Sequence, residues 1–179
     1  MFKIILASKS KVRKKILDEH SILNEVRHSN VDEDIIKTSL LKENASPEII
    51  SKNLAELKAN KVSITEKDNL VLGADSVIDL DGELISKPNS RQEALVILKK
   101  LNGKKHFLIS SVCISKNGAM VWNYSDKAAL TMKKMTDDEL KNYLKKISDE
   151  TLYAYNVYQI EGEGRNLFLN IEGDENTIM

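Results

Sequence analysis

The sequence contains a single cysteine, Cys113, and only three histidines, which are widely separated along the chain. One cysteine cannot form an internal disulfide, and His20, His28 and His106 lack the clustered spacing of a zinc site. Proteins without disulfides are typical of a reducing compartment. The composition therefore argues against a fold held together by disulfides or by structural zinc.

An excess of one charge is also absent, because 27 lysines and arginines balance 27 aspartates and glutamates. A chain without net charge has no overall field that attracts nucleic acid or an anionic membrane, so any anion must be bound by a local cluster. No apolar run approaches membrane-spanning length, and the apolar part of MFKIILASKS is too short for a signal peptide. We expect a cytoplasmic protein with no polymeric nucleic acid partner and no membrane partner.

The chemistry is expected in residues 69–88, which read NLVLGADSVIDLDGELISKP. Two β-favouring runs, Leu70–Leu72 and Val77–Leu80, are separated by a segment that contains a glycine. The second run ends at Asp81-Gly82, which is a turn signal. This pattern predicts two strands and a tight turn.

Asp75 follows the first of these runs, and Gly73 lies just before it. A carboxylate just past a buried strand, with a glycine that lets a backbone or ligand approach closely, is typical of catalytic acids and metal ligands in α/β proteins. A capping or turn aspartate is the alternative that this segment alone leaves open.

An apolar run at residues 4–7 predicts a strand inside a sheet. Ser8 and the residues after it lead into a helix, for which Ser10 is the predicted N-cap. The free N–H groups and the positive end of such a helix suit a phosphate, and Lys11 and Arg13 add positive charge. No Walker pattern is present, so this is not a P-loop, and an ordinary capped helix with solvated lysines remains the alternative.

The next segment carries weaker signals. Residues 22–29 show a weak strand pattern, and the acidic stretch SNVDEDIIK, at residues 29–37, predicts a loop. Asp32 and Glu33 are solvated charges unless the fold turns them toward Asp75. In that case they could contribute to the few hard oxygen ligands that Mg²⁺ needs besides substrate phosphates.

A serine followed by a proline predicts that a helix starts at Ser46, and its pattern continues to about Val62. Leu54 and Leu57 belong to its apolar stripe. Lys58 stands at the edge of that stripe, where a long stem can lie along the core and carry its ammonium group into a cleft.

Two capping boxes predict further helices, and a glycine turn predicts a hairpin between two long strands. The final third of the chain alternates aromatic residues with glycines and predicts strands that close back onto the sheet. In order, these elements are a helix from Ser90 and Glu93, strands at 106–116 and 120–132, a helix from Thr136 and Glu139, and strands within residues 153–174.

Seven short motifs occur in the order and rough spacing of one family. They are LASKS with Arg13, Asp32-Glu33, Leu54-Ala55 with Lys58-Ala59, Gly73-Ala74-Asp75-Ser76, Asp81-Gly82 with Lys87-Pro88, Leu101 with Gly103 and His106, and Ile160-Glu161-Gly162-Glu163-Gly164. On this ordered set the chain resembles the Maf family over essentially its whole length, as a single domain at residues 1–179. The resemblance implies an α/β fold with helices and an elongated mixed β-sheet, in which two lobes flank a central cleft, as in the inosine triphosphate pyrophosphatases.

The Maf resemblance implies a nucleoside triphosphate pyrophosphatase that cleans the nucleotide pool. It would cut nucleoside triphosphates between the α- and β-phosphates, with the help of Mg²⁺ or Mn²⁺. Asp75 matches the catalytic aspartate, which would bind the metal or take the proton of the attacking water, and Glu33 matches a second metal-binding position. The polar and cationic positions around the triphosphate are matched by Ser8, Ser10, Arg13, Lys58 and Lys87.

The chain departs from the Maf pattern in three places. Lys11-Val12-Arg13 replaces a proline and a double arginine, so one arginine with its bidentate fork is missing. Ala154–Tyr158 stands for Lys-Ala-Gly-Ala-Tyr, with Asn156, which tolerates a left-handed backbone, in place of the glycine. The sequence ends at Met179, before a family Gly-Leu-Pro-Leu segment, so we expect some C-terminal packing to be absent. The uncovered surface predicts either a marginal monomer or a homodimer that hides it.

Glu161 carries the expectation about the base. Maf members that prefer UTP and TTP have glutamine before the Gly-x-Gly pair, whereas members that prefer 7-methyl-GTP have glutamate, as here. A carboxylate only accepts hydrogen bonds, which suits the N1–H and amine of guanine, and its charge complements the methylated ring. We expect a modified purine nucleotide, and a solvent-facing turn residue is the alternative.

Two other functions remain open from the sequence. The first is a catalytically weak nucleotide-binding protein that regulates cell division and septum formation by contact. The second is a phosphatase that acts on small phosphorylated metabolites. Release of pyrophosphate indicates the pyrophosphatase, release of orthophosphate the phosphatase, and binding without turnover the regulator.

Overall fold

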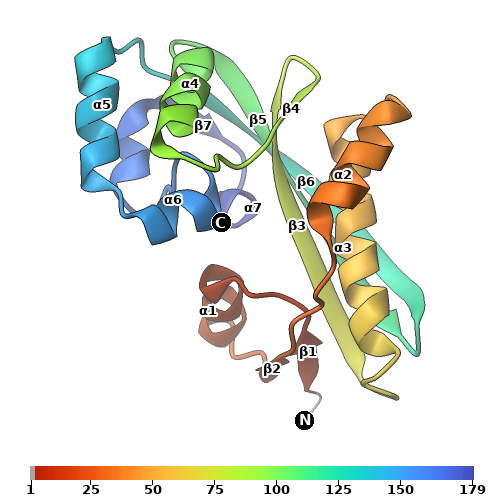
Figure 1. Ribbon diagram of the computed structural model, residues 1–179. Coiled ribbons are helices and arrows are strands. Elements are labelled where there is room, and N and C mark those ends of the chain that lie inside the picture. Colours follow the sequence, from red (N-terminus) through yellow and green to blue (C-terminus); the bar gives the residue numbers. More distant parts are fainter. Residues whose placement is uncertain (1–2) are drawn as a thin grey trace. The chain divides into compact units, whose positions relative to one another are not determined.

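The computed structural model describes residues 3–179. Its strands form one mixed sheet in the order β2-β1-β3-β5-β6-β7, and β4 pairs with β3 outside this path. The strands are β1 (Ile4–Leu6), β2 (Asn24–Val26), β3 (Leu70–Leu80), β4 (Glu83–Ile85), β5 (Lys105–Lys116), β6 (Ala119–Met132) and β7 (Phe168–Glu172) (Figure 1). The predicted α/β class with helices and a mixed sheet is confirmed.

β1 has the interior position that its apolar sequence predicts. It lies between β2 and β3 and is parallel to both. Ile5 and Leu6 are buried, as expected for a strand that is covered on both faces. β4 pairs antiparallel with β3, and β7 pairs antiparallel with β6, so the sheet is mixed.

Each α-helix of the described chain begins at a side chain that accepts a hydrogen bond from a backbone N–H of the first turn. The helices are α1 (Lys11–Glu19), α2 (Glu33–Lys42), α3 (Pro47–Ser63), α4 (Arg91–Leu101), α5 (Asp137–Lys146), α6 (Asp149–Tyr155) and α7 (Glu175–Ile178), with the 3-10 helix η1 (Glu163–Leu167). Their N-caps are Ser10, Asp32, Ser46, Ser90, Thr136, Ser148 and Asp174. The four helix starts predicted from the sequence, at Ser10, Ser46, Ser90 and Thr136, are therefore confirmed.

The chain divides into two compact units. The first contains the chain up to Val77 together with Ile109–Asp126, and the second contains Ile78–Leu108 and Lys127–Met179. Strands β3, β5 and β6 each contribute residues to both units.

In the first unit, Gly73 lets α3 pack directly on β3. A Cβ atom at Gly73 would lie 2.2 Å from the carbonyl oxygen of Ala55 and 2.7 Å from the backbone nitrogen of Ala59. Figure 1 shows α3 running alongside β3, with α2 next to it. Because Gly73 has no side chain, the helix that carries Lys58 can pack closely against the strand that carries Asp75.

The second unit contains the larger apolar core, in which α4 and α5 pack against each other. His106 lies fully buried there, with its Nε2 atom 3.0 Å from the hydroxyl oxygen of Tyr158. Its Nδ1 atom has no hydrogen-bond partner among the described residues. Burial lowers the pKa of His106 from 6.5 to about 4, because the charged imidazolium would lose its hydration.

We expect this histidine to make the protein less stable in mild acid. The unfolded chain binds a proton near pH 6.5, whereas the folded protein does not bind it until about pH 4, so stability falls as the pH drops through that window. The free energy of unfolding should decrease by about 2 kcal/mol between roughly pH 7.5 and pH 5 through this group alone.

Denaturant titrations of the wild type and of His106→Gln at the two pH values measure the effect. Glutamine keeps a polar side chain near Tyr158 but does not titrate, and the carboxylates titrate alike in both proteins. The wild type should therefore lose more stability than the variant. An equal loss in both proteins would assign the acid sensitivity to other groups.

The strand break expected at Gly73 is wrong, since β3 runs without interruption from Leu70 to Leu80. The close approach of another backbone that the sequence predicts at Gly73 is confirmed, since the backbone of α3 packs against it. The turn at Asp81-Gly82 is confirmed, because β4 folds back on β3 directly after it. Leu57, expected in the buried stripe of α3, is 39% exposed, and the buried face includes Lys58 instead.

The prediction of a loop at residues 29–37 is also wrong, because most of this acidic stretch forms the start of α2. The Asp32 side chain accepts a hydrogen bond from the backbone nitrogen of Ile35 at 3.2 Å, and Glu33 and Asp34 lie in the first turn. Negative side chains are favourable at that end of a helix because they face the positive end of its dipole. Acidic residues therefore mark a helix start here.

Residues 153–174 contain the end of α6, turns, η1 and β7, so the prediction that they form strands is wrong except at β7. Asn156 ends α6 with a φ of +70°, which fits its place where the family has glycine. Gly164 packs against backbone, because a Cβ atom there would lie 2.6 Å from the nitrogen of Gln159. These glycine and asparagine positions serve turns and close packing between short helices.

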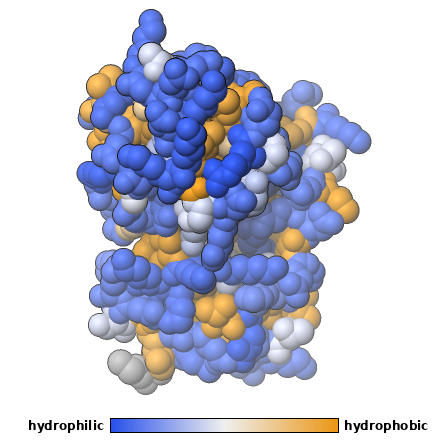
Figure 2. Space-filling view, turned by 60° about the vertical axis from the view of Figure 1, so that its left-hand side comes forward, coloured by the Kyte–Doolittle hydropathy of each residue, from blue (hydrophilic) through white to orange (hydrophobic). Residues whose placement is uncertain are grey.

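The face of the molecule seen in Figure 2 is mostly hydrophilic, and apolar residues reach it in separate groups. Scattered exposed apolar residues are normal on folded proteins and do not by themselves mark a docking surface. Within residues 3–179, no helix is both long enough and apolar enough to span a membrane.

Candidate functional site

Asp75 lies at the centre of a polar cluster in the first unit. It sits in the middle of β3, and its side chain is only 7% exposed. Its Oδ1 atom accepts a hydrogen bond from the Nζ atom of Lys58 at 2.8 Å. Lys58 comes from the buried face of α3, where its side chain is 8% exposed. A buried carboxylate and a buried ammonium group therefore form an ion pair between a helix and the strand beneath it.

Glu33 extends this pair from the first turn of α2. Its Oε1 atom lies 2.9 Å from the Nζ atom of Lys58, so one ammonium group bridges two carboxylates. Asp32, the other acidic residue of the motif, caps α2 instead. Of the two acidic residues that the sequence left open, the fold thus turns only Glu33 toward Asp75.

One oxygen of the cluster is unsatisfied. The Oδ2 atom of Asp75 is buried and has no hydrogen-bond partner among the described residues. A buried carboxylate oxygen without a partner is costly and calls for an explanation such as an ion, a water or a catalytic role. Over residues 3–179, no group of three or more His, Cys, Asp or Glu side chains is arranged to hold a metal ion. A cation here would therefore need ligands from its substrate as well.

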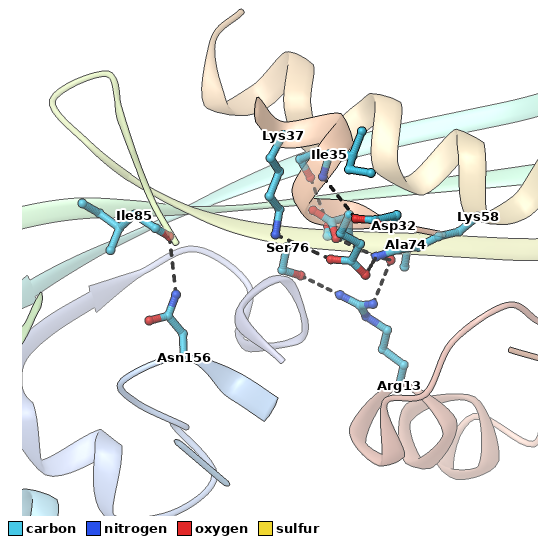
Figure 3. A network of polar contacts seen from close by, with 12 residues as sticks. Arg13, Asp32, Ile35, Lys37, Lys58, Ala74, Ser76, Ile85 and Asn156 are labelled. Carbon is cyan, nitrogen blue, oxygen red and sulfur yellow. Dashed lines mark hydrogen bonds and ion pairs between the residues drawn. The ribbon is translucent and has the colours of Figure 1, made fainter. Parts of the chain in front are cut away.

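Arg13 reaches the same stretch of β3 from α1. Its two terminal nitrogens donate hydrogen bonds to the carbonyl oxygen of Ala74 at 2.8 Å and to the hydroxyl of Ser76 at 3.1 Å. Figure 3 shows Arg13 and Lys58 converging on this segment from two helices. The backbone of Asp75 is held in addition by the buried hydroxyl of Ser51, which donates to its carbonyl oxygen at 3.1 Å. The catalytic candidate is thus fixed on both sides along its strand.

The two serines of the LASKS motif shape the start of α1. The Ser8 hydroxyl accepts a hydrogen bond from the backbone nitrogen of Ser10 at 3.1 Å. The Ser10 hydroxyl in turn accepts from the backbone nitrogen of Arg13 at 3.3 Å, as an N-cap does. Both hydroxyls therefore organise the loop that leads from β1 to Arg13 in the first unit.

Two of the residues named from the resemblance lie in the second unit. Lys87 is exposed in the segment after β4, and Glu161 is exposed in a turn before η1. The end of β4, two residues before Lys87, is connected to the end of α6, because the Nδ2 atom of Asn156 donates to the carbonyl oxygen of Ile85 at 3.5 Å. The structure thus brings Arg13, Glu33, Lys58 and Asp75 together within one unit, whereas Lys87 and Glu161 belong to the other.

Lys37 is part of the cluster but was not predicted from the sequence. Its Nζ atom lies 3.5 Å from the Oε2 atom of Glu33, one helical turn earlier in α2. The interpretation of this stretch as a loop concealed it, because the spacing of four residues has meaning only on a helix. The capping signal at Asp32 could have revealed it.

Comparison with known proteins places this arrangement in a family. The family model described as Maf-like protein matches residues 3–179. The chain belongs to the Maf family. The resemblance drawn from the ordered motifs is therefore confirmed, and the polar cluster of the first unit is built from four of those motifs.

Relatives of this Maf protein include named pyrophosphatases. It is 72% identical to the nucleoside triphosphate pyrophosphatase of Pelagibacter ubique, over 98% of this chain and 90% of that protein. It is 33% identical to the 7-methyl-GTP pyrophosphatase of Rhizobium etli, over 99% of this chain and 89% of that protein.

Solved structures with a similar fold are more distant. A HAM1 protein from Coxiella burnetii is 13% identical, with a TM-score of 0.48 over 75% of each chain. A nucleoside-triphosphatase, or dITP/XTP pyrophosphatase, from Mycobacterium abscessus is 12% identical, with a TM-score of 0.43 over 73% of each chain.

Proposed function

We propose that this Maf protein hydrolyses nucleoside triphosphates to nucleoside monophosphate and pyrophosphate at the cluster around Asp75. The observation that carries the proposal is the buried, unpartnered Oδ2 atom of Asp75 beside an ion-paired lysine. Family membership and the 72% identical pyrophosphatase support the reaction class. The cleavage site between the α- and β-phosphates follows from the same resemblance.

The donor set fits a divalent cation such as Mg²⁺ or Mn²⁺. Asp75 and Glu33 would hold it, since both are hard oxygen donors that share Lys58 as their partner. Two carboxylates completed by phosphate oxygens and water are the usual environment of Mg²⁺ in nucleotide enzymes. When bound, such an ion neutralises phosphate charge and makes a coordinated water more acidic.

The residues of this chain then have distinct tasks. Asp75 accepts a hydrogen bond from the attacking water at Oδ2 and draws off its proton. Lys58 supplies positive charge beside the phosphates, where negative charge grows on the leaving pyrophosphate. Arg13 holds the Ala74–Ser76 backbone and presents a planar cation for phosphate oxygens. Ser8 and Ser10 keep the N–H groups at the start of α1 in place for the same anion.

An assay of released products tests the proposal directly. The protein is incubated with Mg²⁺ and a panel of nucleoside triphosphates that includes GTP, UTP, TTP and 7-methyl-GTP, and pyrophosphate and orthophosphate are measured separately. Pyrophosphate in equal amounts with the monophosphate is the expected result. Orthophosphate release would instead show a phosphatase, and binding without turnover would show a regulatory nucleotide-binding protein.

The base is proposed to be a modified purine, on the strength of Glu161. The 33% identical relative from Rhizobium etli is a 7-methyl-GTP pyrophosphatase, and a carboxylate suits the donors and the positive charge of that base. We expect the wild type to prefer 7-methyl-GTP over UTP. Glu161→Gln should shift the ratio of kcat/KM toward UTP by about tenfold, the scale of one charge-assisted hydrogen bond.

Competition between the two nucleotides in one reaction measures this ratio. Glu163→Gln is the matched control, because Glu163, the first residue of η1, is the other exposed glutamate of the same motif. A wild-type preference for UTP that Glu161→Gln leaves unaltered would remove Glu161 from base recognition.

A further inference from the structure

Lys37 differs from the other lysines that form ion pairs within helices. Its side chain is only 16% exposed, whereas Lys14, Lys15 and Lys52, in equivalent pairs, are 48%, 70% and 47% exposed. A lysine on a helix surface usually extends into water, because its ammonium group is strongly hydrated. Lys37 is instead drawn toward the polar cluster, as Figure 3 shows.

The cluster is a row of alternating charges in the order Lys37, Glu33, Lys58 and Asp75. Each oxygen of Glu33 faces a different lysine, with Oε1 at 2.9 Å from Lys58 and Oε2 at 3.5 Å from Lys37. Lys58 also pairs with Asp75 and reaches the carbonyl oxygen of Ala74 at 3.5 Å. Among the described residues, Glu33 is the ion-pair partner of Lys37.

This arrangement changes when Glu33 binds a divalent cation. The cation takes the carboxylate oxygens and repels nearby ammonium groups, so Lys37 loses its partner while its side chain stays directed at the site. Lys58 keeps Asp75 and Ala74 as neighbours. Lys37 then has a free ammonium group beside the position of an anionic substrate.

We infer that Lys37 is a further substrate-binding residue, which holds Glu33 in the free protein and binds phosphate oxygens once Glu33 has turned to a divalent cation. This inference rests on the proposed pyrophosphatase function. It also accounts for one missing cation of the family pattern, because Val12 stands where the family has the first arginine and Lys37 adds a positive charge from α2. Phosphate binding at Lys37 would therefore depend on the presence of the metal.

The test combines kinetics with binding of inorganic pyrophosphate measured by calorimetry. In Lys37→Ala, KM for the best substrate of the panel should rise roughly tenfold with kcat nearly unchanged, the scale of one lost hydrogen bond to a charged group. Pyrophosphate should bind about tenfold more weakly at saturating Mg²⁺ and nearly as in the wild type when Mg²⁺ is chelated. Lys37→Arg keeps the charge and should restore most of the affinity.

Lys52→Ala is the matched control, since Lys52 forms an exposed pair of the same spacing with Glu48 on α3. It should change neither KM nor pyrophosphate binding. An active Lys37→Ala variant with normal KM and normal pyrophosphate affinity at saturating Mg²⁺ would overturn the inference and leave the proposed function intact. If Lys37 only positioned Glu33, the variant would need more Mg²⁺ but bind pyrophosphate normally at saturation, which also overturns it.

The converse result separates the two proposals. A wild type that hydrolyses no nucleoside triphosphate, but binds pyrophosphate with Mg²⁺ in a manner that depends on Lys37, would refute the proposed reaction and support Lys37 as a phosphate ligand.

Discussion

Replacing Asp75 by asparagine is expected to lower the rate of nucleotide hydrolysis by at least about a hundredfold, the scale of a lost acid–base group. The amide has the same shape, so its oxygen can still accept the hydrogen bond that Lys58 donates to Oδ1. What it lacks is the negative charge at the second position, where Oδ2 is buried without a partner. A neutral amide neither attracts a divalent cation strongly nor takes a proton from water.

Nucleotide binding should largely survive in Asp75→Asn, because the cations of the cluster remain. Steady-state kinetics with Mg²⁺ and calorimetry with pyrophosphate in the absence of Mg²⁺ therefore give different results, with a collapsed kcat and a nearly unchanged affinity. Asp79→Asn is the matched control, since Asp79 lies four residues further along β3 and binds the backbone nitrogen of Gly82 at 2.7 Å. If Asp75→Asn hydrolysed nucleotides at the wild-type rate, the catalytic step would have to be assigned elsewhere.

The parts of the fold that the sequence predicts correctly are those governed by local chemistry. Ser10, Ser46 and Thr136 each satisfy free N–H groups within their own helix, so the signal and its structural effect lie a few residues apart. The hairpin after Leu80 is similarly local, because the Asp81-Gly82 turn adopts positive φ angles and brings β4 back onto β3.

The incorrect predictions occur where the composition of a segment favours one structure but its position in the fold favours another. Acidic residues at 32–34 are polar enough for a loop, yet they lie where a helix start favours negative charge. Gly73 favours a break between two strands by composition, but β3 runs through it, and only the close backbone approach that was also predicted there is found. Only the packing partner distinguishes these roles, and that partner is far away in the sequence.

The candidate site was equally hard to predict from local sequence, because its residues are far apart along the chain. Glu33, Lys58 and Asp75 come from three elements, and without the family resemblance the sequence gives no reason to bring them together. The position of Lys58 at the edge of the apolar stripe does predict that its ammonium group ends beside polar atoms at the core. It could not predict that the same group bridges two carboxylates.

That bridge makes Lys58 the residue whose loss should cost the most stability. Lys58→Met keeps the apolar stem of the side chain and removes the charge, which leaves Asp75 buried beside Glu33 without a counter-ion. Breaking a buried ion pair in this way costs about 3 kcal/mol, at the lower end of the usual range because Glu33 is partly exposed. Denaturant titrations at neutral pH should show this loss, and hydrolysis should fall as well.

Mg²⁺ should restore part of the stability of Lys58→Met, because a divalent cation can replace the ammonium group between the two carboxylates. The increase in unfolding midpoint on adding Mg²⁺ should therefore be larger in this variant than in the wild type. Lys52→Met is the control on the same helix, since its exposed pair with Glu48 contributes little and its response to Mg²⁺ should equal that of the wild type. Identical responses to Mg²⁺ in the wild type and in Lys58→Met would mean that Asp75 and Glu33 do not hold the cation.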